Sequence, residues 1–124
     1  MARSQFKSKR LVSGKKYIAI RKKRLSELSG LTTETLIGKL RVKVKRVEGG
    51  NTKASLLSHD SICINDKGKT TKLKIVGVEE NPANVNYTRR NIITKGAIVK
   101  TDKGNVKITS RPGQTGTLFG ILIK

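Results

Sequence analysis

The chain has 124 residues, which is enough for one domain but not for two large cores. It carries 28 Lys and Arg residues against 8 Asp and Glu residues, a formal net charge of +20 at pH 7, so its natural partner is a polyanion. The sequence has no apolar run of about 18 residues or more, no apolar signal-peptide core and no prenylation cysteine at its end. These absences predict a cytoplasmic protein without a membrane partner.

The amino-terminal tract is strongly basic, with ten cations and no acidic residue in the first 24 positions. A block of like charge with few apolar residues stays disordered until a partner of opposite charge orders it. Within this tract, residues 21–28 can form one or two helical turns, which Gly30 would end in the left-handed conformation. We predict that residues 1–38 form a basic arm, extended or partly helical, that becomes ordered on binding. Its cations are Arg3, Lys7, Lys9, Arg10, Lys15, Lys16, Arg21, Lys22, Lys23 and Arg24.

From Lys39 onward, short β-type runs alternate with Gly, Asn and Asp residues. The first run, 40–45, places apolar residues between Arg41, Lys43 and Lys45, so one face of the strand should be buried while the other presents cations. Gly49 and Gly50 end this run. Further strands are predicted at 61–64, 71–78, 92–101, 106–110 and 117–123, with Gly77 as a bulge in the second of these.

The turns between these runs carry recognisable residues. Residues 65–68 and 102–104 both end in Gly and fit hairpin loops, with the second Gly in the left-handed position. Residues 111–114 fit a type II turn, in which Gly113 would have positive φ. Residues 79–91 form the longest irregular stretch. We therefore predict an all-β fold, a small antiparallel β-barrel of about five or six strands over residues 39–124, preceded by the extended basic arm.

Residues that could support catalysis are few. Cys63 is the single cysteine and cannot form an internal disulfide, which is typical of a reducing compartment. The single histidine, His59, lies next to Asp60, but adjacent residues in a strand point to opposite faces and no activated nucleophile is indicated. Glu79 and Glu80 are consecutive in a predicted loop, and a zinc site needs about four ligands. We expect no enzymatic activity, no metal, no cofactor and no small-molecule substrate.

Nucleic acid is the polyanion that the pattern favours. No recognition helix or zinc finger for duplex DNA is present, and the only aromatic residues are Phe6, Tyr17, Tyr87 and Phe119. Because base-reading sheets depend on exposed aromatics, this composition indicates binding to the phosphate backbone and folded shape of RNA. Phe119, in an apolar run, is assigned to the core. Tyr87 either packs or contacts a base.

Three arginines after residue 80 are predicted phosphate contacts. Arg89 and Arg90 lie in the long irregular stretch, and Arg111 opens the Pro-Gly turn, so each can present a guanidinium to phosphate in paired hydrogen bonds. Isolated lysines such as Lys67 and Lys103 are interpreted as solvated surface charges. The predicted RNA-binding set is therefore the ten cations of the arm with Arg41, Lys43, Lys45, Arg89, Arg90 and Arg111.

Several stretches of the sequence form recognisable motifs. They are 81–97 (NPANVNYTRRNIITKGA), 109–116 (TSRPGQTG), Glu48–Asn51 followed by Leu56 and Leu57, and the basic 21–24 before Leu25 and Leu28. Together these stretches resemble the small-subunit ribosomal protein "S eight-e" family in its archaeal form. The resemblance implies a β-barrel, an arm that threads through ribosomal RNA, a structural role and no enzymatic activity or cofactor. Residues 52–55 (TKAS) are less basic than is usual in this family, so that loop is predicted to be a weak RNA contact.

The partners predicted from the residues and the resemblance together are small-subunit ribosomal RNA and neighbouring small-subunit ribosomal proteins, with no homo-oligomer. The place of the protein would be the ribosome in the cytoplasm. A free-standing RNA chaperone or translation factor that binds ribosomes reversibly is the main competing function. A ribonuclease that uses His59 and a chromatin-type architectural protein are further candidate functions.

Overall fold

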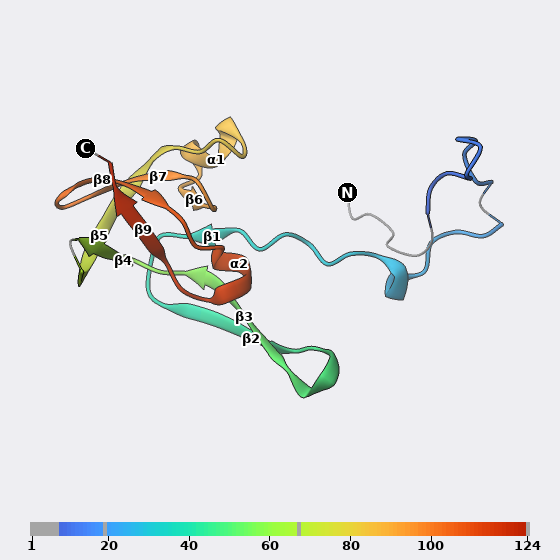
Figure 1. Cartoon of the computed structure of the whole chain (residues 1–124), viewed down its shortest axis with the longest axis horizontal. Coiled ribbons are helices and arrows are strands. Elements are labelled where there is room, and N and C mark those ends of the chain that lie inside the picture. The colour runs from blue at the N-terminus through green and yellow to red at the C-terminus, as the bar shows by residue number, and fades with distance from the viewer. Residues whose placement is uncertain (1–7, 19, 67, 124) are drawn as a thin grey trace. The chain divides into compact units, whose positions relative to one another are not determined.

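The computed structural model describes residues 8–18, 20–66 and 68–123 (Figure 1). The chain divides into an N-terminal unit, Met1–Thr32, and a C-terminal unit, Thr33–Lys124. The sequence predicts the boundary between residues 38 and 39, whereas the C-terminal unit begins earlier. Thr35 explains the difference because it is fully buried in that unit and its Oγ1 donates a 2.7 Å hydrogen bond to the backbone oxygen of Leu56.

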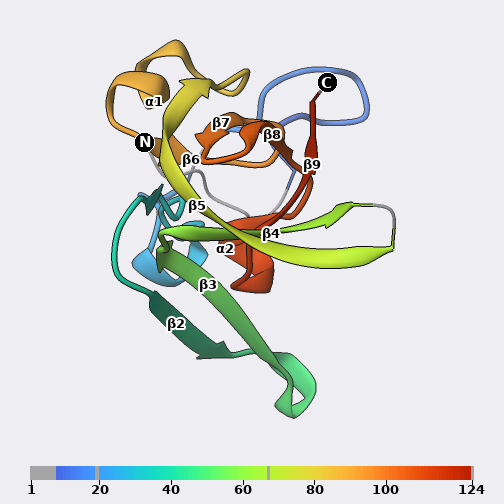
Figure 2. The same ribbon diagram turned by 90° about the vertical axis from the view of Figure 1, so that its left-hand side faces the viewer.

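Five strands of the C-terminal unit form a closed barrel in the order β4-β5-β7-β8-β9. They are β4 Ser61–Asp66, β5 Lys69–Glu80, β7 Ile98–Thr101, β8 Gly104–Ile108 and β9 Phe119–Leu122. Neighbours pair antiparallel except β4 and β9, whose parallel pairing closes the barrel (Figure 2). The predicted small all-β barrel is confirmed. Within the barrel, the described strands depart from the antiparallel arrangement at the β4–β9 pair.

Alternation along the strands fills the barrel interior. Side chains at every second position point inward, as expected for a pleated strand. Those at most 6% exposed include Ile62 and Ile64 of β4, Leu73 and Ile75 of β5, Val99, Val106 and Ile108. The core is therefore built mainly from β-branched residues, which pack well on a pleated surface.

Gly120 determines which side of β9 faces inward. A Cβ at this position would lie 2.5 Å from Cγ1 of Val106 and 2.8 Å from the backbone oxygen of Lys107, so the interior has no room for a side chain there. Because neighbours in a strand point to opposite faces, Phe119 lies on the outer face and is 48% exposed. The prediction that Phe119 belongs to the core is therefore wrong.

The hairpin loops confirm two of the turn predictions. Gly68, with φ 82°, follows β4, and Gly104, with φ 126°, pairs with Thr101 across the β7–β8 turn. The register of β5 shifts between Ile75 and Gly77, so the predicted bulge at Gly77 is confirmed. Strand β5 is longer than predicted and contains Glu79 and Glu80, which the sequence placed in a loop.

A second sheet has the strand order β2-β3-β1-β6. Its strands are β1 Thr35–Leu36, β2 Arg41–Arg46, β3 Thr52–Ser58 and β6 Ile92–Ile93. Strand β3 was not predicted, since only its Leu56 and Leu57 read as apolar. The 3-10 turn η2, Glu48–Gly50, joins β2 to β3 through Gly49 and Gly50 at φ 72° and 74°. Leu56 is fully buried and joins this sheet to the barrel core.

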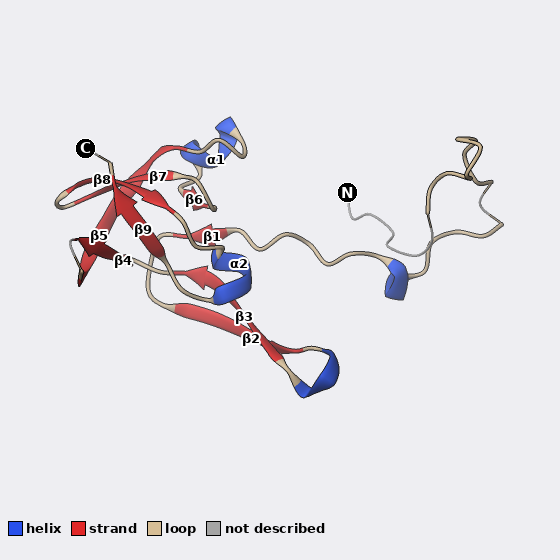
Figure 3. Ribbon diagram, in the orientation of Figure 1, coloured by secondary structure: helices blue, strands red, loops and turns tan. Residues whose placement is uncertain are grey.

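Strands β2 and β3 form a hairpin, here called the ribbon, that extends away from the barrel strands (Figure 3). Every residue of β2 is exposed, with Val42 at 42% and Val44 at 64%. The prediction that one face of this strand is buried is therefore wrong. The alternation is real, but β2 is the edge strand of its sheet and its two valines stay exposed.

Two short helices occupy stretches for which the sequence predicted no helix. Helix α1, Val85–Arg89, begins where Oδ1 of Asn84 accepts a 2.9 Å hydrogen bond from the backbone N–H of Asn86. Helix α2, Pro112–Thr115, replaces the predicted type II turn, and Gly116 at φ 71° ends it in place of the expected Gly113. Among the described residues, no helix is long and apolar enough to span a membrane.

The described part of the N-terminal unit contains one short helix, the 3-10 turn η1, Leu25–Glu27. The predicted helical turns over 21–28 are reduced to this single turn, and Gly30 does not take positive φ. One turn is too short to offset the cost of helix nucleation, and Leu28 already returns to extended geometry. Nearer the amino terminus, Arg10 and Lys16 form an isolated antiparallel bridge around Gly14.

Candidate nucleic-acid interface

The ribbon collects cations from two strands on one face. Arg41, Lys43 and Lys45 alternate along β2, and the register places Lys53 of β3 directly opposite Lys45. All four side chains are exposed. We call Arg41, Lys43, Lys45 and Lys53 the cationic face. The sequence analysis treated residues 52–55 as a loop with weak RNA contact and left Lys53 out of the predicted set, whereas the structure places Lys53 in β3.

The pairing of Lys45 with Lys53 is unfavourable in the free protein. Residues directly opposite in an antiparallel pair have Cβ atoms roughly 4.5–5.5 Å apart, and like charges at that separation destabilise the pair. Among the described residues, ion pairs join Arg21 to Glu27 and Arg90 to Glu34, and Nδ1 of His59 lies 3.3 Å from Oδ1 of Asp60, so none of these contacts involves the cationic face. An anion bound across the ribbon would relieve this repulsion.

Arg111 lies near the ribbon because α2 packs against β3. The hydroxyl of Ser55 donates a 2.8 Å hydrogen bond to the backbone oxygen of Gly113, and a Cβ on Gly116 would lie 2.7 Å from Cβ of Ala54. Arg111 immediately precedes α2 and is exposed. The structure therefore brings Arg111 to the part of the sheet that carries the cationic face.

Arg89 and Arg90 lie elsewhere. They are in and just after α1, which Figures 1 and 2 both place at the far side of the C-terminal unit from the ribbon. Nη2 of Arg90 donates a 2.7 Å hydrogen bond to Oε2 of Glu34, so this guanidinium already has an anionic partner in the same unit. Arg89 is exposed. The predicted contacts of the C-terminal unit therefore fall into two separate groups.

The predicted cations of the N-terminal unit that the structure describes are all exposed: Lys9, Arg10, Lys15, Lys16, Arg21, Lys22, Lys23 and Arg24. Arg3 and Lys7 lie outside the described residues. Nη1 of Arg10 donates a 2.7 Å hydrogen bond to the backbone oxygen of Gly14, which steadies the turn between Arg10 and Lys16.

Arg21 forms an ion pair with an acidic side chain of its own unit. Its guanidinium pairs with the Glu27 carboxylate, with Nη1 lying 3.3 Å from Oε2. The hydrogen bond from Arg21 lowers the pKa of Glu27, and the same bond raises the pKa of Arg21. The pair links the start of the 21–24 basic run to η1.

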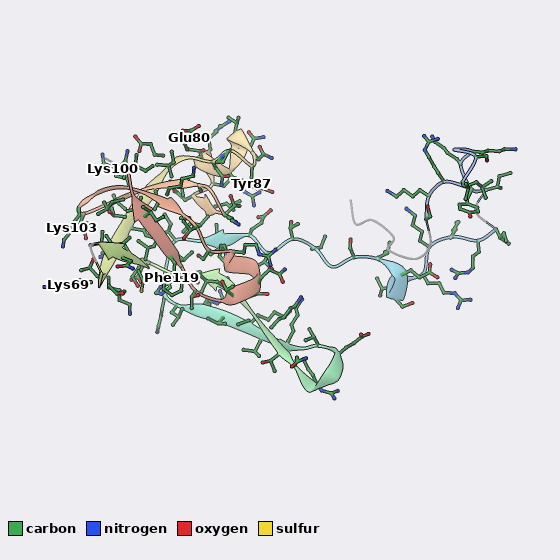
Figure 4. All side chains as sticks on the ribbon, viewed as in Figure 1. Lys69, Glu80, Tyr87, Lys100, Lys103 and Phe119 are labelled. Atoms are coloured by element: carbon green, nitrogen blue, oxygen red, sulfur yellow. The ribbon has the colours of Figure 1, made fainter. Side chains whose placement is uncertain are left out.

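The outer face of the barrel carries further lysines that were not predicted as contacts. They are Lys69, Lys72, Lys74, Lys100, Lys103 and Lys107, all exposed (Lys69, Lys100 and Lys103 are labelled in Figure 4). The sequence contained a signal for two of these lysines, because Lys72 and Lys74 alternate with the buried Leu73 and Ile75. Lys67 lies outside the described residues.

The sequence predicts that His59 and Asp60 point to opposite faces of a strand. In the structure they instead contact each other in the β3–β4 turn. Nδ1 of His59 lies 3.3 Å from Oδ1 of Asp60 and 3.0 and 3.4 Å from the backbone nitrogens of Asp60 and Ser61. Nε2 of the same ring lies 3.4 Å from the Ser61 hydroxyl oxygen. All of these contacts join three consecutive residues, 59–61.

The described residues also contain no group of three or more His, Cys, Asp or Glu side chains placed to hold a metal ion. The features with the geometry of a binding surface are therefore the exposed cations.

Comparison with known proteins identifies the family. The family model described as Ribosomal protein S8e matches residues 4–123. The chain belongs to the ribosomal protein S8e family. Small ribosomal subunit protein eS8 of Methanobrevibacter smithii is 51% identical over 125 residues, covering 99% of this chain and 100% of that protein. The proteins of the same name from Methanocorpusculum labreanum and Nanoarchaeum equitans are each 47% identical, covering 97% of this chain and 98% and 96% of theirs.

Membership in the S8e family confirms the resemblance drawn from 81–97, 109–116 and the other stretches, and it confirms the archaeal form. The family consists of ribosomal proteins and not of enzymes. A proposed function therefore has to account for the exposed cations described above.

Proposed function

We propose that this chain is a structural constituent of the small ribosomal subunit and binds small-subunit ribosomal RNA through its phosphate backbone and folded shape. The names of the archaeal relatives, small ribosomal subunit protein eS8, support the place in the subunit and, with it, in the cytoplasm. The observation that carries the RNA-binding part is the cationic face, where Lys45 and Lys53 stand opposite each other without an anionic partner among the described residues.

Phosphate is the anion that suits this face. A lysine ammonium is a compact point charge with three donors, so it follows a phosphate backbone without demanding one base sequence. Each phosphate contact releases condensed counterions, which favours binding at low salt. A phosphate seated between Lys45 and Lys53 would turn a repulsive pair into two attractive contacts.

The N-terminal unit is proposed to add a second set of contacts. Its cations are exposed, and the positive charge of this tract is offset by one carboxylate, Glu27. Ordering a chain costs about 1–2 kcal/mol of backbone entropy per residue, so the unit gains most order where RNA phosphates neutralise it. Arg89, Arg90 and Arg111 are proposed as further contacts, with Arg90 exchanging or sharing its Glu34 partner.

Sedimentation tests the place in the subunit. A native cell extract is run on a density gradient before and after a high-salt wash, and the chain is followed across the fractions. Stoichiometric retention in washed small subunits is the expected result. Loss of the chain into the light fractions would refute the structural role and favour a factor that binds ribosomes reversibly.

A matched pair of variants tests the cationic face. The triple variant Lys43→Gln, Lys45→Gln, Lys53→Gln is compared with Lys69→Gln, Lys100→Gln, Lys103→Gln, which removes the same charge from the barrel. Binding of each full chain to small-subunit ribosomal RNA is measured over a range of salt concentrations. The first variant should flatten the logarithmic salt slope by about 2–3, since each lost phosphate contact contributes roughly 0.7–0.9. Equal slopes for the two variants would contradict the assignment.

A further inference from the structure

The outer face of β9 holds an apolar pair that the fold does not use. Phe119 is 48% exposed and Ile121 is 59% exposed, both on the side opposite the buried Gly120 (Phe119 is labelled in Figure 4). A shift of β9 by one residue in register would turn Phe119 into the interior position that Gly120 now holds. That position has no room for a side chain, because a Cβ there would lie 2.5–2.9 Å from atoms of Val106, Lys107 and Ile62. The packing of the barrel therefore forces an aromatic ring outward.

Cations flank this pair on both sides. The register places Cys63 of β4 beside Phe119 and Lys72 of β5 beside Cys63, so Lys72 is two strands away, roughly 10 Å. On the other side, Lys107 of β8 pairs directly with Ile121. Lys72 and Lys107 are both exposed. Phe119 and Ile121 thus lie on the outer face of the barrel with Lys72 on one side of the pair and Lys107 on the other.

In the row of paired residues that contains Ile121, the first acidic residue of the described strands is Glu80. Along the row that contains Ile121, the neighbours are Lys107, then Ile98, then Glu80 of β5, three strands from β9. A ligand that combines a flat apolar surface with adjacent negative charge matches this arrangement. A nucleotide of single-stranded RNA has both, since its base has a π-face and its phosphates lie on either side.

We propose that an unpaired RNA base stacks on Phe119, with the flanking phosphates held by Lys72 and Lys107. This single-strand site deepens the proposed function and rests on it. It differs from the cationic face of the ribbon in kind, because stacking requires a base that has left a helix, whereas the ribbon contacts the backbone of folded RNA.

Binding of the full chain to a 12-nucleotide oligouridylate tests the stacking. Phe119→Ala should weaken binding about 5- to 150-fold, the range for loss of one stacked base, while Phe119→Tyr should retain it within about twofold. The same oligonucleotide annealed to oligoadenylate presents no free base, so Phe119→Ala should leave its binding unchanged. Ile121→Ala is the matched control, since it removes a neighbouring exposed apolar side chain that is not aromatic. Loss for the duplex as well, or an equal loss with Ile121→Ala, would overturn the proposal.

Folding of the variants is checked by thermal unfolding, and Phe119→Leu, which keeps apolar volume without a flat ring, serves where Phe119→Ala unfolds. Phe119→Leu should also lose single-strand binding, and retained binding in that variant overturns the stacking role.

A photocrosslinking phenylalanine analogue at position 119, in cells that assemble the full chain into ribosomes, identifies the occupant directly. A crosslink to RNA in salt-washed small subunits supports the proposal. A crosslink to a neighbouring protein, or none, overturns it while leaving the chain in the subunit. Absence of the chain from the subunit would instead count against the proposed function itself.

Discussion

Replacing Lys53 with glutamine should make the free protein more stable and its binding to RNA weaker. In the structure Lys53 stands directly opposite Lys45, and the described residues offer no ion pair to either. Removing one charge of such a cross-strand pair should stabilise the fold by about 0.2–1 kcal/mol at low salt. The gain should shrink at high salt because the repulsion is screened. The logarithmic salt slope of RNA binding should flatten by roughly 0.7–0.9, the contribution of one phosphate contact.

The stability part is measured by urea unfolding of Lys45→Gln, Lys53→Gln and the double variant, so that the cycle isolates the interaction between the two side chains. Lys103→Gln is the control, because Lys103 is exposed in the β7–β8 turn and its removal changes net charge equally. The RNA part is measured by titration into small-subunit ribosomal RNA at several salt concentrations. A coupling of zero between positions 45 and 53, together with a salt slope like that of the control, would refute the reasoning.

Three further predictions test other parts of the molecule. Deleting Met1–Arg24 should leave the barrel folded in urea titrations but lower RNA affinity and flatten its salt dependence, because ten cations are lost; an unchanged slope would exclude a role for them. Gly120→Ala should cost about 1–3 kcal/mol in a urea titration, since its Cβ would crowd the Lys107 backbone oxygen, and a cost below about 0.5 kcal/mol would contradict the packing argument. Because the hydrogen bond from Arg21 lowers the pKa of Glu27, their contact should persist as the pH falls past the ordinary value of 4.5 and be lost only through the lowered pKa. An NMR titration of the Glu27 carboxyl carbon checks this, with Arg21→Gln as the control in which the pKa of Glu27 should rise; an unchanged pKa in that variant would contradict the assignment.

Local sequence was enough to predict most of the barrel. Alternating apolar residues in β5 and β8, and glycines at 68 and 104, specify strands and hairpin loops whatever lies around them. The bulge at Gly77 was also visible, since an isolated glycine in a strand often marks one. Strand β3 was not predicted because residues 52–55 (TKAS) carry little apolar signal. Its pairing with β2 and β1 makes it a strand.

The short helices depend on contacts between distant parts of the chain. Residues 111–114 fit a type II turn on local grounds, and the chain instead forms α2, whose Gly113 oxygen accepts a hydrogen bond from Ser55. Gly116, and not Gly113, takes positive φ and lies against Ala54. A turn of four residues makes too few local interactions to determine its own conformation. Its conformation therefore depends on the surface against which it packs.

For this protein the sequence by itself determined the net charge, the alternation of the strands, the S8e family and the cations of the first 24 residues. The tertiary structure decided which side chains meet: Lys53 opposite Lys45, Arg90 paired with Glu34, and Phe119 turned outward by Gly120. An alternating sequence predicts that a strand has an apolar face and a polar face, but it does not predict which elements cover either face. Coverage and strand register arise from residues far apart in the chain, which a local pattern does not contain.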